Sequence, residues 1–350
     1  ISEIANSVVV MYKGNIVDKG DVNSIFNAPQ HNYTKALINS RPSLKTRLKV
    51  LPTIDDYLNN SISNTVITAE DRKLKHQKLY SKKPLLEIIN VEKEYISKSG
   101  WFTKPRTFKA VNNVSFKLYE GETLGLVGES GCGKSTLGNA ILQLDKATAG
   151  QILYDGVDIT KLSNSAIKTL RKDIQIIFQD PFSSLNPRAR VSRILTEGLI
   201  AHGASKLDAM AKARELLEMV GLGASAMARF PHEFSGGQRQ RIGIARALAL
   251  DPSIIIADEA VSALDVSIQA QVLDLLAELK TRLDLSMLFI THDLRVAARI
   301  CDRIIVMQRG QIVEVGPTRK VLHDPDTAYT RSLLEAIPGQ DYERALTEMV

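Results

Sequence analysis

Four short apolar runs along the chain predict the core of the fold. They occupy residues 123–127, 174–178, 254–257 and 287–290, and segments of helical character separate them. Strands that are apolar on both faces are typical of a parallel sheet covered by helices. The pattern therefore predicts an α/β fold whose core sheet is mostly parallel and is joined by crossover helices.

Two further patterns predict smaller parts of the fold. Residues 86–91 and 110–118 are strand-like, and a polar insertion at 97–107 separates them. They predict a small antiparallel β subdomain ahead of the core sheet. Residues 191–202 and 205–220 have helical periodicity, with Met210, Leu216, Leu217 and Val220 on one side. The block at 181–230 is therefore expected to form an inserted α-helical subdomain.

A sequence repeat relates the two ends of the chain. Residues 9–20 match residues 305–316 without a gap, and Gly14 matches Gly310 at an offset of 296 positions. Further matches pair Pro29 with Pro325, Tyr33 with Tyr329, Thr34 with Thr330, Leu37 with Leu333 and Pro42 with Pro338. Two unrelated hairpins with similar turns are one explanation. The ungapped length favours another, in which residues 1–42 are the last part of an earlier copy of the domain.

The remaining segments complete the predicted organisation. Residues 43–84 are polar and contain a basic run at 72–78, so we interpret them as an irregular linker. The basic side chains of this run are expected to be solvated, which is favoured over contact with anionic lipid head groups. One complete domain is expected at 85–338, followed by a tail at 339–350. The chain starts at Ile1 and not at Met, so we expect it to be a fragment.

Composition and charge narrow the classes of function. The chain has 350 residues and a net charge of +6, which is too mild to argue by itself for a nucleic-acid partner. Cys132 and Cys301 are its only cysteines, and their spacing indicates neither a metal cluster nor a disulfide framework. A reducing compartment is therefore favoured. No apolar run approaches the ~20 residues that span a bilayer.

A glycine-rich segment follows the first apolar run and leads into helical residues 137–142. Its members are Gly128, Glu129, Ser130, Gly131, Cys132, Gly133, Lys134, Ser135 and Thr136. Strand, glycine-rich turn and helix in this order are the context of a phosphate-binding loop. Lys134 would reach the β- and γ-phosphates of a nucleoside triphosphate, and Ser135 would hold Mg²⁺. The alternative, a plain turn, is disfavoured by the spacing and the Lys-Ser pair.

Polar residues also follow the other core strands. Asp258 and Glu259 come after residues 254–257, where the first carboxylate can hold Mg²⁺ and the second can orient a water molecule. Gln179 follows 174–178, from which its amide could reach Mg²⁺ or that water. His292 lies just beyond 287–290, where it could donate to a γ-phosphate. Each alone fits an ordinary polar residue, but together they indicate nucleotide hydrolysis.

With these motifs in place, residues 85–338 resemble an ABC-type ATPase domain, a phosphate-loop NTPase. Residues 128–136 match its Walker A motif and residues 254–259 its Walker B motif. Gln179 falls at the Q-loop, His292 at the switch histidine, and Asp265 ends a D-loop at 262–265. The family signature is matched by Ser235, Gly236, Gly237 and Gln238, preceded by Phe234 where the family usually has Leu.

The resemblance implies an active site shared by two domains. They would close head to tail on ATP and Mg²⁺, with the signature and D-loop of one domain facing the nucleotide held by the other. Glu259 would act as the base or water-positioning group, and His292 would stabilise developing charge. Adenine would stack on Tyr95, which is favoured over Trp101 and Phe102 of the insertion.

The two related endings resemble one branch of the family. Residues 31–37 and 323–334 are similar to the C-terminal motif of oligopeptide, dipeptide and nickel importer ATPases. Its presence twice implies the second half of a fused subunit with tandem ATPase domains. The implied partners are a second ATPase domain, from the first half or from another copy, two membrane permeases at the 181–230 lobe, and indirectly a substrate-binding protein. The implied location is peripheral, on the cytoplasmic face of the membrane.

Two other classes of function are compatible with parts of the pattern. A soluble tandem ABC ATPase acting on ribosomes or nucleic acid would predict a dense basic arm, whereas the basic residues here are modest in number. No nucleic-acid partner is therefore expected. A degenerate ATPase kept for docking is disfavoured by Lys134, Asp258, Glu259 and His292. The leading interpretation is an ATP-hydrolysing subunit that powers peptide import.

Overall fold

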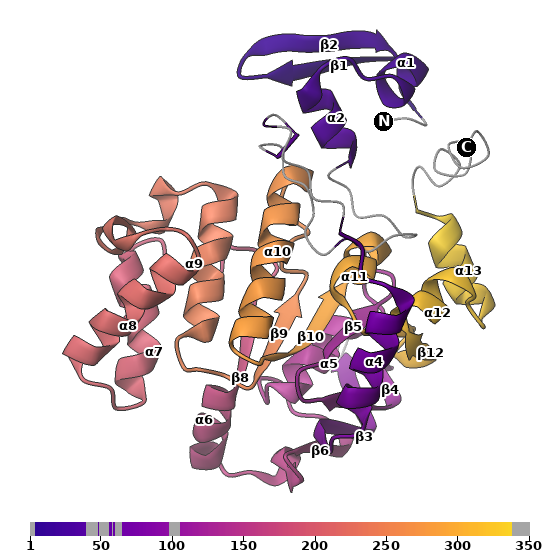
Figure 1. Ribbon diagram of the computed structural model, residues 1–350. Helices are drawn as coiled ribbons and strands as arrows, with labels where there is room; N and C mark the ends of the chain where they lie inside the picture. The colour runs from indigo at the N-terminus through magenta and orange to yellow at the C-terminus, as the bar shows by residue number, and fades with distance from the viewer. Residues whose placement is uncertain are drawn as a thin grey trace.

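The structure, a computed structural model, describes residues 4–39, 48, 56, 57, 59, 65–97 and 106–337. Figure 1 shows a large body of sheets and helices, with a small hairpin-and-helix unit from the N-terminal part of the chain above it. Pro42, Trp101, Phe102, Pro338 and the expected tail at 339–350 lie outside the described residues. Within the described part, no helix combines the length and apolar character needed to cross a bilayer.

A six-stranded sheet forms the centre of the large body. Its order is β12-β11-β5-β10-β9-β8, and all neighbours pair in parallel except β11 with β12. The strands are β5 (Thr123–Val127), β8 (Ile174–Ile177), β9 (Ile254–Asp258), β10 (Ser286–Thr291), β11 (Arg303–Gln308) and β12 (Gln311–Pro317). Every residue of β5 and β10 is buried, which explains their continuous apolar sequence. The predicted α/β core is confirmed.

Helices cover this sheet and connect its strands, as Figure 1 shows. They are α5 (Lys134–Ile141), α6 (Asn164–Asp173), α10 (Val266–Arg282) and α11 (Leu294–Ile300). Helix α5 starts directly after the glycine-rich segment that follows β5, and α10 connects β9 to β10. The carboxyl ends of β5, β9 and β10 therefore lie beside one another, because these three strands are parallel neighbours.

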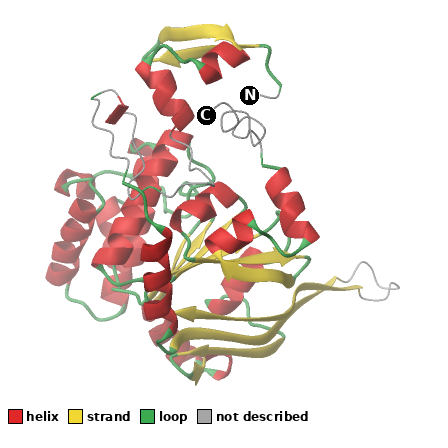
Figure 2. Ribbon diagram, turned by 45° about the vertical axis from the view of Figure 1, so that its right-hand side comes forward, coloured by secondary structure: helices red, strands yellow, loops and turns green. Residues whose placement is uncertain are grey.

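A second, antiparallel sheet has the order β4-β3-β6-β7, and its long strands are visible in Figure 2. Strands β3 (Pro84–Ser97) and β4 (Arg106–Tyr119) form the predicted antiparallel pair. The sequence did not predict β6 (Ala149–Tyr154) or β7 (Val157–Asp158), because Ile152 is the only fully buried residue of β6. Strand β6 forms because it pairs with β3, with Leu86 opposite Tyr154.

The inserted helical subdomain contains α7 (Val191–Ala201), α8 (Lys206–Met219), the 3₁₀ turns η2 (Ala224–Ala228) and η3 (Pro231–Glu233), and leads into α9 (Gly236–Leu248). Ser205 caps α8 by accepting a hydrogen bond from the Asp208 backbone N–H at 3.1 Å. Leu216 and Leu217 are buried in the same hydrophobic cluster as β9 and β10 residues. The subdomain is therefore packed as an extension of the core.

The sequence repeat extends to backbone geometry. The N-terminal unit contains β1 (Ser7–Tyr12), β2 (Asn15–Asp21), α1 (Val22–Asn27) and α2 (Asn32–Asn39), and the C-terminal part of the large body ends in α12 (Thr318–His323) and α13 (Ala328–Glu335). Val10 pairs with Asp18 in the first hairpin, and Val306 pairs with Glu314 in the second. Each hairpin then has a register shift at the next residue, Met11 or Met307. This shared irregularity is consistent with residues 1–42 being the last part of an earlier copy of the domain.

The interpretation of residues 43–84 as an irregular linker is wrong for residues 69–80. They form helix α4 (Ala69–Tyr80), which starts with a reciprocal capping box between Thr68 and Asp71. The helix has no apolar stripe, and Leu79 is its only buried residue. Polar contacts hold it on the large body, including a 3.1 Å hydrogen bond from the Tyr80 hydroxyl to Glu122. Hydrophobic periodicity could not reveal such a helix.

Asp302 is the main polar anchor beneath α4. Its side chain is 3% exposed and accepts hydrogen bonds from the Thr123 backbone N–H at 3.0 Å, Lys75 Nζ at 2.5 Å and Lys280 Nζ at 3.3 Å. Lys75 is 44% exposed, whereas Lys280 is largely buried and burial lowers its pKa. In the buried Lys280–Asp302 pair, each charge therefore offsets the cost of burying the other.

We expect Asp302→Ala to lower the free energy of unfolding by about 3–5 kcal/mol, because it leaves the Lys280 ammonium buried without its carboxylate. Lys75→Ala, the matched change on the exposed side of the same carboxylate, should cost no more than about 1 kcal/mol. Urea denaturation followed by circular dichroism measures both variants. Equal losses in the two variants would contradict the assigned role of Asp302.

Candidate functional site

The glycine-rich segment folds as a loop between β5 and α5 in which two glycines lie against neighbouring backbone. Gly128 has φ 153° and Gly133 has φ 108°. A Cβ atom at Gly128 would lie 2.2 Å from the Met307 carbonyl oxygen, and one at Gly133 would lie 2.1 Å from the Ala110 carbonyl oxygen. No side chain fits at either position. The loop therefore places its backbone N–H groups at the N-terminus of α5, where an anion is stabilised.

Lys134 is the first residue of α5 and turns back over the loop. Its ammonium donates to the carbonyl oxygens of Gly128 and Glu129, both at 2.8 Å, and the residue is only 4% exposed. The Lys134 ammonium also lies 3.7 Å from the sulfur of Cys132, and burial raises the pKa of that thiol. The buried cation and the helix N-terminus together make the loop electropositive, as phosphate binding requires.

Ser135 and Asp258 meet across the end of the core sheet. The Ser135 hydroxyl donates to Asp258 Oδ1 at 3.1 Å, although the two residues are on α5 and β9. Burial raises the pKa of Asp258, and the hydrogen bond from Ser135 opposes this rise. A hydroxyl and a carboxylate at this spacing are hard oxygen donors of the type that Mg²⁺ prefers alongside phosphate oxygens. The two residues thus fit the predicted metal position.

Of the three residues predicted to be catalytic, Glu259 is contacted by the other two. Gln179 Nε2 donates to Glu259 Oε2 at 2.7 Å, and His292 Nδ1 lies 3.2 Å from Glu259 Oε1. The Glu259 backbone has φ 48° and donates its N–H to the Ile290 carbonyl at 2.9 Å. A non-glycine residue in this region is strained, and such strain is concentrated at functional sites. The geometry therefore brings Gln179, Glu259 and His292 together beside Asp258.

The signature residues form the N-terminus of α9. Ser235 Oγ accepts from the Gln238 backbone N–H at 3.3 Å, and Gln238 Oε1 accepts from the Ser235 N–H at 3.1 Å. Gly237 packs against α10, because a Cβ there would lie 2.4 Å from Ile268 Cγ2. Asp265 caps α10 by accepting from the Ile268 N–H at 3.2 Å. The signature and the D-loop are thus two adjoining helix N-termini.

Gly236 and Phe234 are the remaining residues of the signature segment. Gly236 opens α9, and Phe234 before it is buried with the Arg229 guanidinium 4.0 Å from its ring centroid. The unusual Phe is therefore accommodated as an apolar anchor. In Figure 1, α9 lies on one side of α10 and the phosphate-loop helix α5 lies on the other. The two sets of anion-binding groups in this chain therefore occupy separate places.

Tyr95, the predicted adenine-stacking residue, lies in β3 beside the loop. Its hydroxyl donates to Asp145 Oδ2 at 2.6 Å. The hydrogen bond to Asp145 raises the pKa of Tyr95. Lys93 also contacts Asp145 and lies 5.2 Å from the Tyr95 ring centroid. The residue remains 43% exposed although its hydroxyl is held by Asp145.

Sequence reasoning missed Asp145 and Lys93, because only tertiary contacts connect them to the motifs. Ser130 and Gly131 lie in the loop, and Thr136 lies in the first turn of α5. No atom lies within 4 Å of a Cβ built at Gly131, which has φ 78°. Within the described residues, no group of three or more His, Cys, Asp or Glu side chains is arranged to hold a metal ion.

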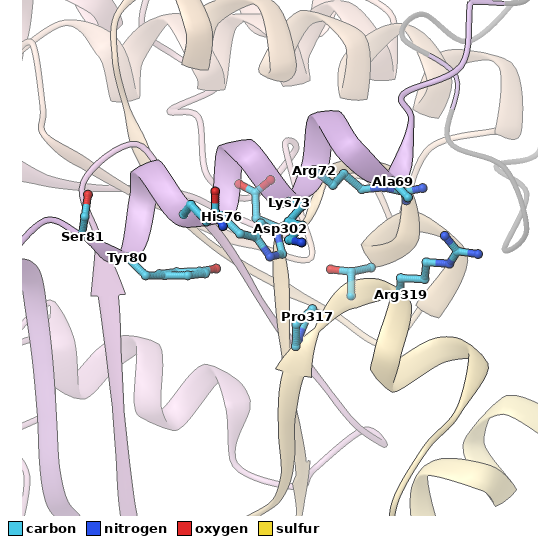
Figure 3. Close-up of a pocket in the computed structure, with 11 residues that line it drawn as sticks. Ala69, Arg72, Lys73, His76, Tyr80, Ser81, Asp302, Pro317 and Arg319 are labelled. Atoms are coloured by element: carbon cyan, nitrogen blue, oxygen red, sulfur yellow. The ribbon is translucent and has the colours of Figure 1, made fainter.

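A separate cavity lies between α4 and the segment that joins β12 to α12 (Figure 3). Its volume is about 760 Å³, and its lining includes Arg72, Lys73, His76 and Arg319. Burial lowers the pKa of His76. None of the predicted nucleotide-binding or catalytic residues lines this cavity. It is thus distinct from the site at the phosphate loop.

Comparison with protein families gives two matches. The ABC transporter family model matches residues 111–262. The model for the C-terminal region of oligopeptide/dipeptide transporters matches residues 17–63 and again residues 313–349. The second family thus matches both members of the sequence repeat.

Curated relatives resemble the whole chain. It is 44% identical to the glutathione import ATP-binding protein GsiA of Pectobacterium atrosepticum and 46% identical to the protein of that name from Shigella boydii. Each alignment covers 100% of this chain and 56% of the relative. The chain therefore spans about half the length of the curated relatives it matches.

Solved structures resemble the large body. The dimeric ATP-binding cassette MJ0796, bound to ADP and Pi in a post-hydrolysis state, is 33% identical with a TM-score of 0.59, over 67% of this chain and 98% of that one. The cbiO1 structure from Clostridium perfringens, part of the ABC transporter complex cbiONQ, has a TM-score of 0.62 at 24% identity. That likeness covers 75% of this chain and 100% of cbiO1, and it supports the fold.

The close backbone contact at Gly133 leads to a test of the loop. Gly133→Ala should lower the free energy of unfolding by about 2–5 kcal/mol, since a Cβ there adds a clash with Ala110 to the strain of a positive φ. Gly131→Ala is the matched control, with a positive φ but open space, and should cost about 1–2 kcal/mol. Urea unfolding compares them, and an equal cost at both positions would refute the packing argument.

Proposed function

Since this chain belongs to the ABC transporter family, we propose that residues 85–338 form an ATPase cassette that powers the import of small peptides across a membrane. The convergence of Gln179 and His292 on Glu259, next to the Ser135–Asp258 pair, carries this proposal. A role in docking alone would need neither of these contacts to the Glu259 carboxylate.

ATP is the substrate that the loop geometry favours. The backbone N–H groups from Gly131 to Thr136 and the N-terminus of α5 would bind its β- and γ-phosphates. Lys134, already turned over the loop, would add a charge-assisted contact to the same phosphates. The ring of Tyr95 would stack on adenine while Asp145 holds its hydroxyl.

Ser135 and Asp258 would hold Mg²⁺. The Gln179 amide, which donates to Glu259, would reach either the ion or the attacking water. The ion would neutralise charge on the phosphate oxygens, as it does in phosphate-loop ATPases generally. Glu259 would accept a proton from the attacking water or orient it, and Gln179 and His292 fix the two oxygens of that carboxylate. This arrangement supports in-line hydrolysis to ADP and phosphate.

A second cassette would complete the site. Ser235, Gly236 and Gly237 lie at the N-terminus of α9, and Asp265 lies at the N-terminus of α10, so they present anion-binding groups on another part of the chain. Head-to-tail closure would bring these groups onto ATP bound to the partner's loop. The first half of a longer polypeptide is the partner favoured by the double match to the importer C-terminal region, and a second copy is the alternative.

Peptide import is proposed from the relatives and from the importer-type endings. The curated relatives are named for import of glutathione, which is itself a small peptide. Two membrane permeases would bind the lobe at residues 181–230, which contains α7 and α8. A substrate-binding protein would deliver the peptide to them. The chain would then be peripheral, on the cytoplasmic face of the membrane.

Exposed apolar side chains near Gln179 support permease docking at the lobe. Phe182 is exposed, and the Arg239 guanidinium lies 3.9 Å from its ring centroid. Arg239 belongs to α9 and its Nε donates to the Phe234 carbonyl at 2.9 Å. Phe182 thus connects the segment after Gln179 to the signature helix, so a permease that contacts it would act on both.

The hydrolytic role of Glu259 has a direct test. Glu259→Gln keeps the shape of the side chain but cannot accept a proton, so kcat should fall by roughly 10²–10⁴ while ATP affinity is kept. Lys134→Ala should instead weaken ATP binding, because it removes a buried cation from the phosphate site. Phosphate release and isothermal titration calorimetry distinguish the two effects. Near-normal turnover in Glu259→Gln would move the hydrolytic role to another residue.

Permease docking is tested by copurification with the cognate membrane subunits. Phe182→Glu should reduce recovery of the cassette with the permeases by at least about tenfold, since it introduces a charge into an apolar contact. Leu144→Glu changes another exposed apolar residue, after α5, and should leave recovery unchanged. If both variants copurify like the unaltered chain, or if no association occurs with the fold intact, the docking proposal fails.

A further inference from the structure

The phosphate loop is held from outside by the C-terminal part of the chain. The Gly310 N–H, in the turn between β11 and β12, donates to the Cys132 carbonyl at 2.9 Å. The Gly310 carbonyl in turn accepts from the Asn112 N–H of β4 at 2.8 Å. Gly310 has φ 81°, and a Cβ there would lie 2.9 Å from the Ala110 carbonyl oxygen. The hairpin turn is therefore fitted against the middle of the loop.

Tyr329 of α13 holds the beginning of the same loop. Its hydroxyl accepts a hydrogen bond from the Glu129 backbone N–H at 3.4 Å. Burial raises the pKa of Tyr329, which favours the neutral hydroxyl. The Glu129 carbonyl accepts from Lys134 Nζ at 2.8 Å. One residue of the loop is thus held by Tyr329 through its N–H and by the phosphate-site lysine through its carbonyl.

Glu314 of β12 fixes the start of α13. Its two carboxylate oxygens accept from the backbone N–H groups of Asp326 at 2.9 Å and Thr327 at 3.2 Å. Thr327 caps α13 by accepting from the Thr330 N–H at 3.1 Å. Burial alone would raise the pKa of Glu314, but the hydrogen bonds from Thr330, Asp326 and Thr327 outweigh it and lower the pKa. A charged carboxylate therefore sets the position from which Tyr329 reaches the loop.

The N-terminal unit repeats the carboxylate-to-backbone contact made by Glu314, which we call the anchor, but it has no phosphate loop beside it. Asp18, which matches Glu314, accepts from the His31 N–H at 3.1 Å, as Glu314 does from Thr327. Tyr33 matches Tyr329, but its ring packs against that of Tyr12, with centroids 4.3 Å apart and the planes tilted by 31°. Gly14 matches Gly310, and no atom lies within 4 Å of a Cβ built there. The anchor belongs to the repeated unit itself, and its contact with the loop is a separate interaction.

We propose that Tyr329 is a positioning residue for the phosphate loop, so that the C-terminal segment from β12 to α13 sets nucleotide affinity. By accepting from Glu129, the hydroxyl keeps the start of the loop in the conformation that the Gly310 contact fixes at its middle. This inference rests on the proposed function, since it concerns the same nucleotide site. The resulting effect is on binding and not on the hydrolytic groups around Glu259.

The test compares matched tyrosines in the full chain. Tyr329→Phe removes the hydroxyl and keeps the ring, and should raise the Kd for Mg·ADP by about two- to tenfold, as expected for one hydrogen bond. Tyr33→Phe makes the same change in the N-terminal unit and should leave the Kd unchanged. Isothermal titration calorimetry with Mg·ADP gives the Kd, and differential scanning calorimetry gives the melting temperature. The expected result is a raised Kd for Tyr329→Phe at an unaltered melting temperature.

A second pair of variants tests the anchor. Glu314→Gln should raise the Kd for Mg·ADP in the same direction, and adding it to Tyr329→Phe should cause no further loss, because both act through one contact. Asp18→Asn is its matched control and should have no effect on the Kd. This pair keeps the proposal testable if Tyr329→Phe folds poorly.

The outcomes separate the inference from the proposed function. If the unaltered chain does not bind Mg·ADP, the proposed function fails. If it binds and Tyr329→Phe binds equally well, the inference alone is overturned. A lower melting temperature with an unchanged Kd, or an equal rise in Kd for Tyr33→Phe, also overturns it, because neither result comes from the contact with Glu129.

Discussion

The phosphate loop depends on close contact between backbones, and the rest of the cassette is arranged to allow it. Gly128 lies against the carbonyl of Met307 in the core sheet, and Gly133 lies against that of Ala110 in the antiparallel sheet. The loop is thus enclosed between strands of two different sheets, with no room for a side chain on either side. Packing of the two sheets against each other therefore determines the shape of the anion site.

The correctly predicted parts of the fold are those that a short stretch of sequence is enough to identify. Strands β5, β9 and β10 are buried on both faces, so hydrophobicity alone marks them, and the polar residues after them mark the site. The fold class and the family followed from these patterns. The grouping of Gln179 and His292 around Glu259 could only be expected from the parallel order of the strands.

The parts that were not predicted depend on distant partners. Helix α4 is placed by contacts such as Lys75 with Asp302, and strand β6 exists because β3 provides an edge for it. Asp145 holds Tyr95 across 50 positions of sequence. Polar contacts of this kind have no periodicity, so a single sequence contains no local sign of them. The same reason explains why the sequence did not predict the contact of Tyr329 with the phosphate loop.

The N-terminal hairpin has a consequence for how the isolated chain behaves in solution. Val9 and Met11 of β1 are 47% and 59% exposed, whereas their counterparts Ile305 and Met307 in β11 are fully buried. Strand β11 pairs with β5 on one side, but within the described residues β1 pairs only with β2. An open edge with apolar side chains is a template for pairing between molecules. Self-association through this edge would not require nucleotide, and it would have to be told apart from assembly driven by ATP.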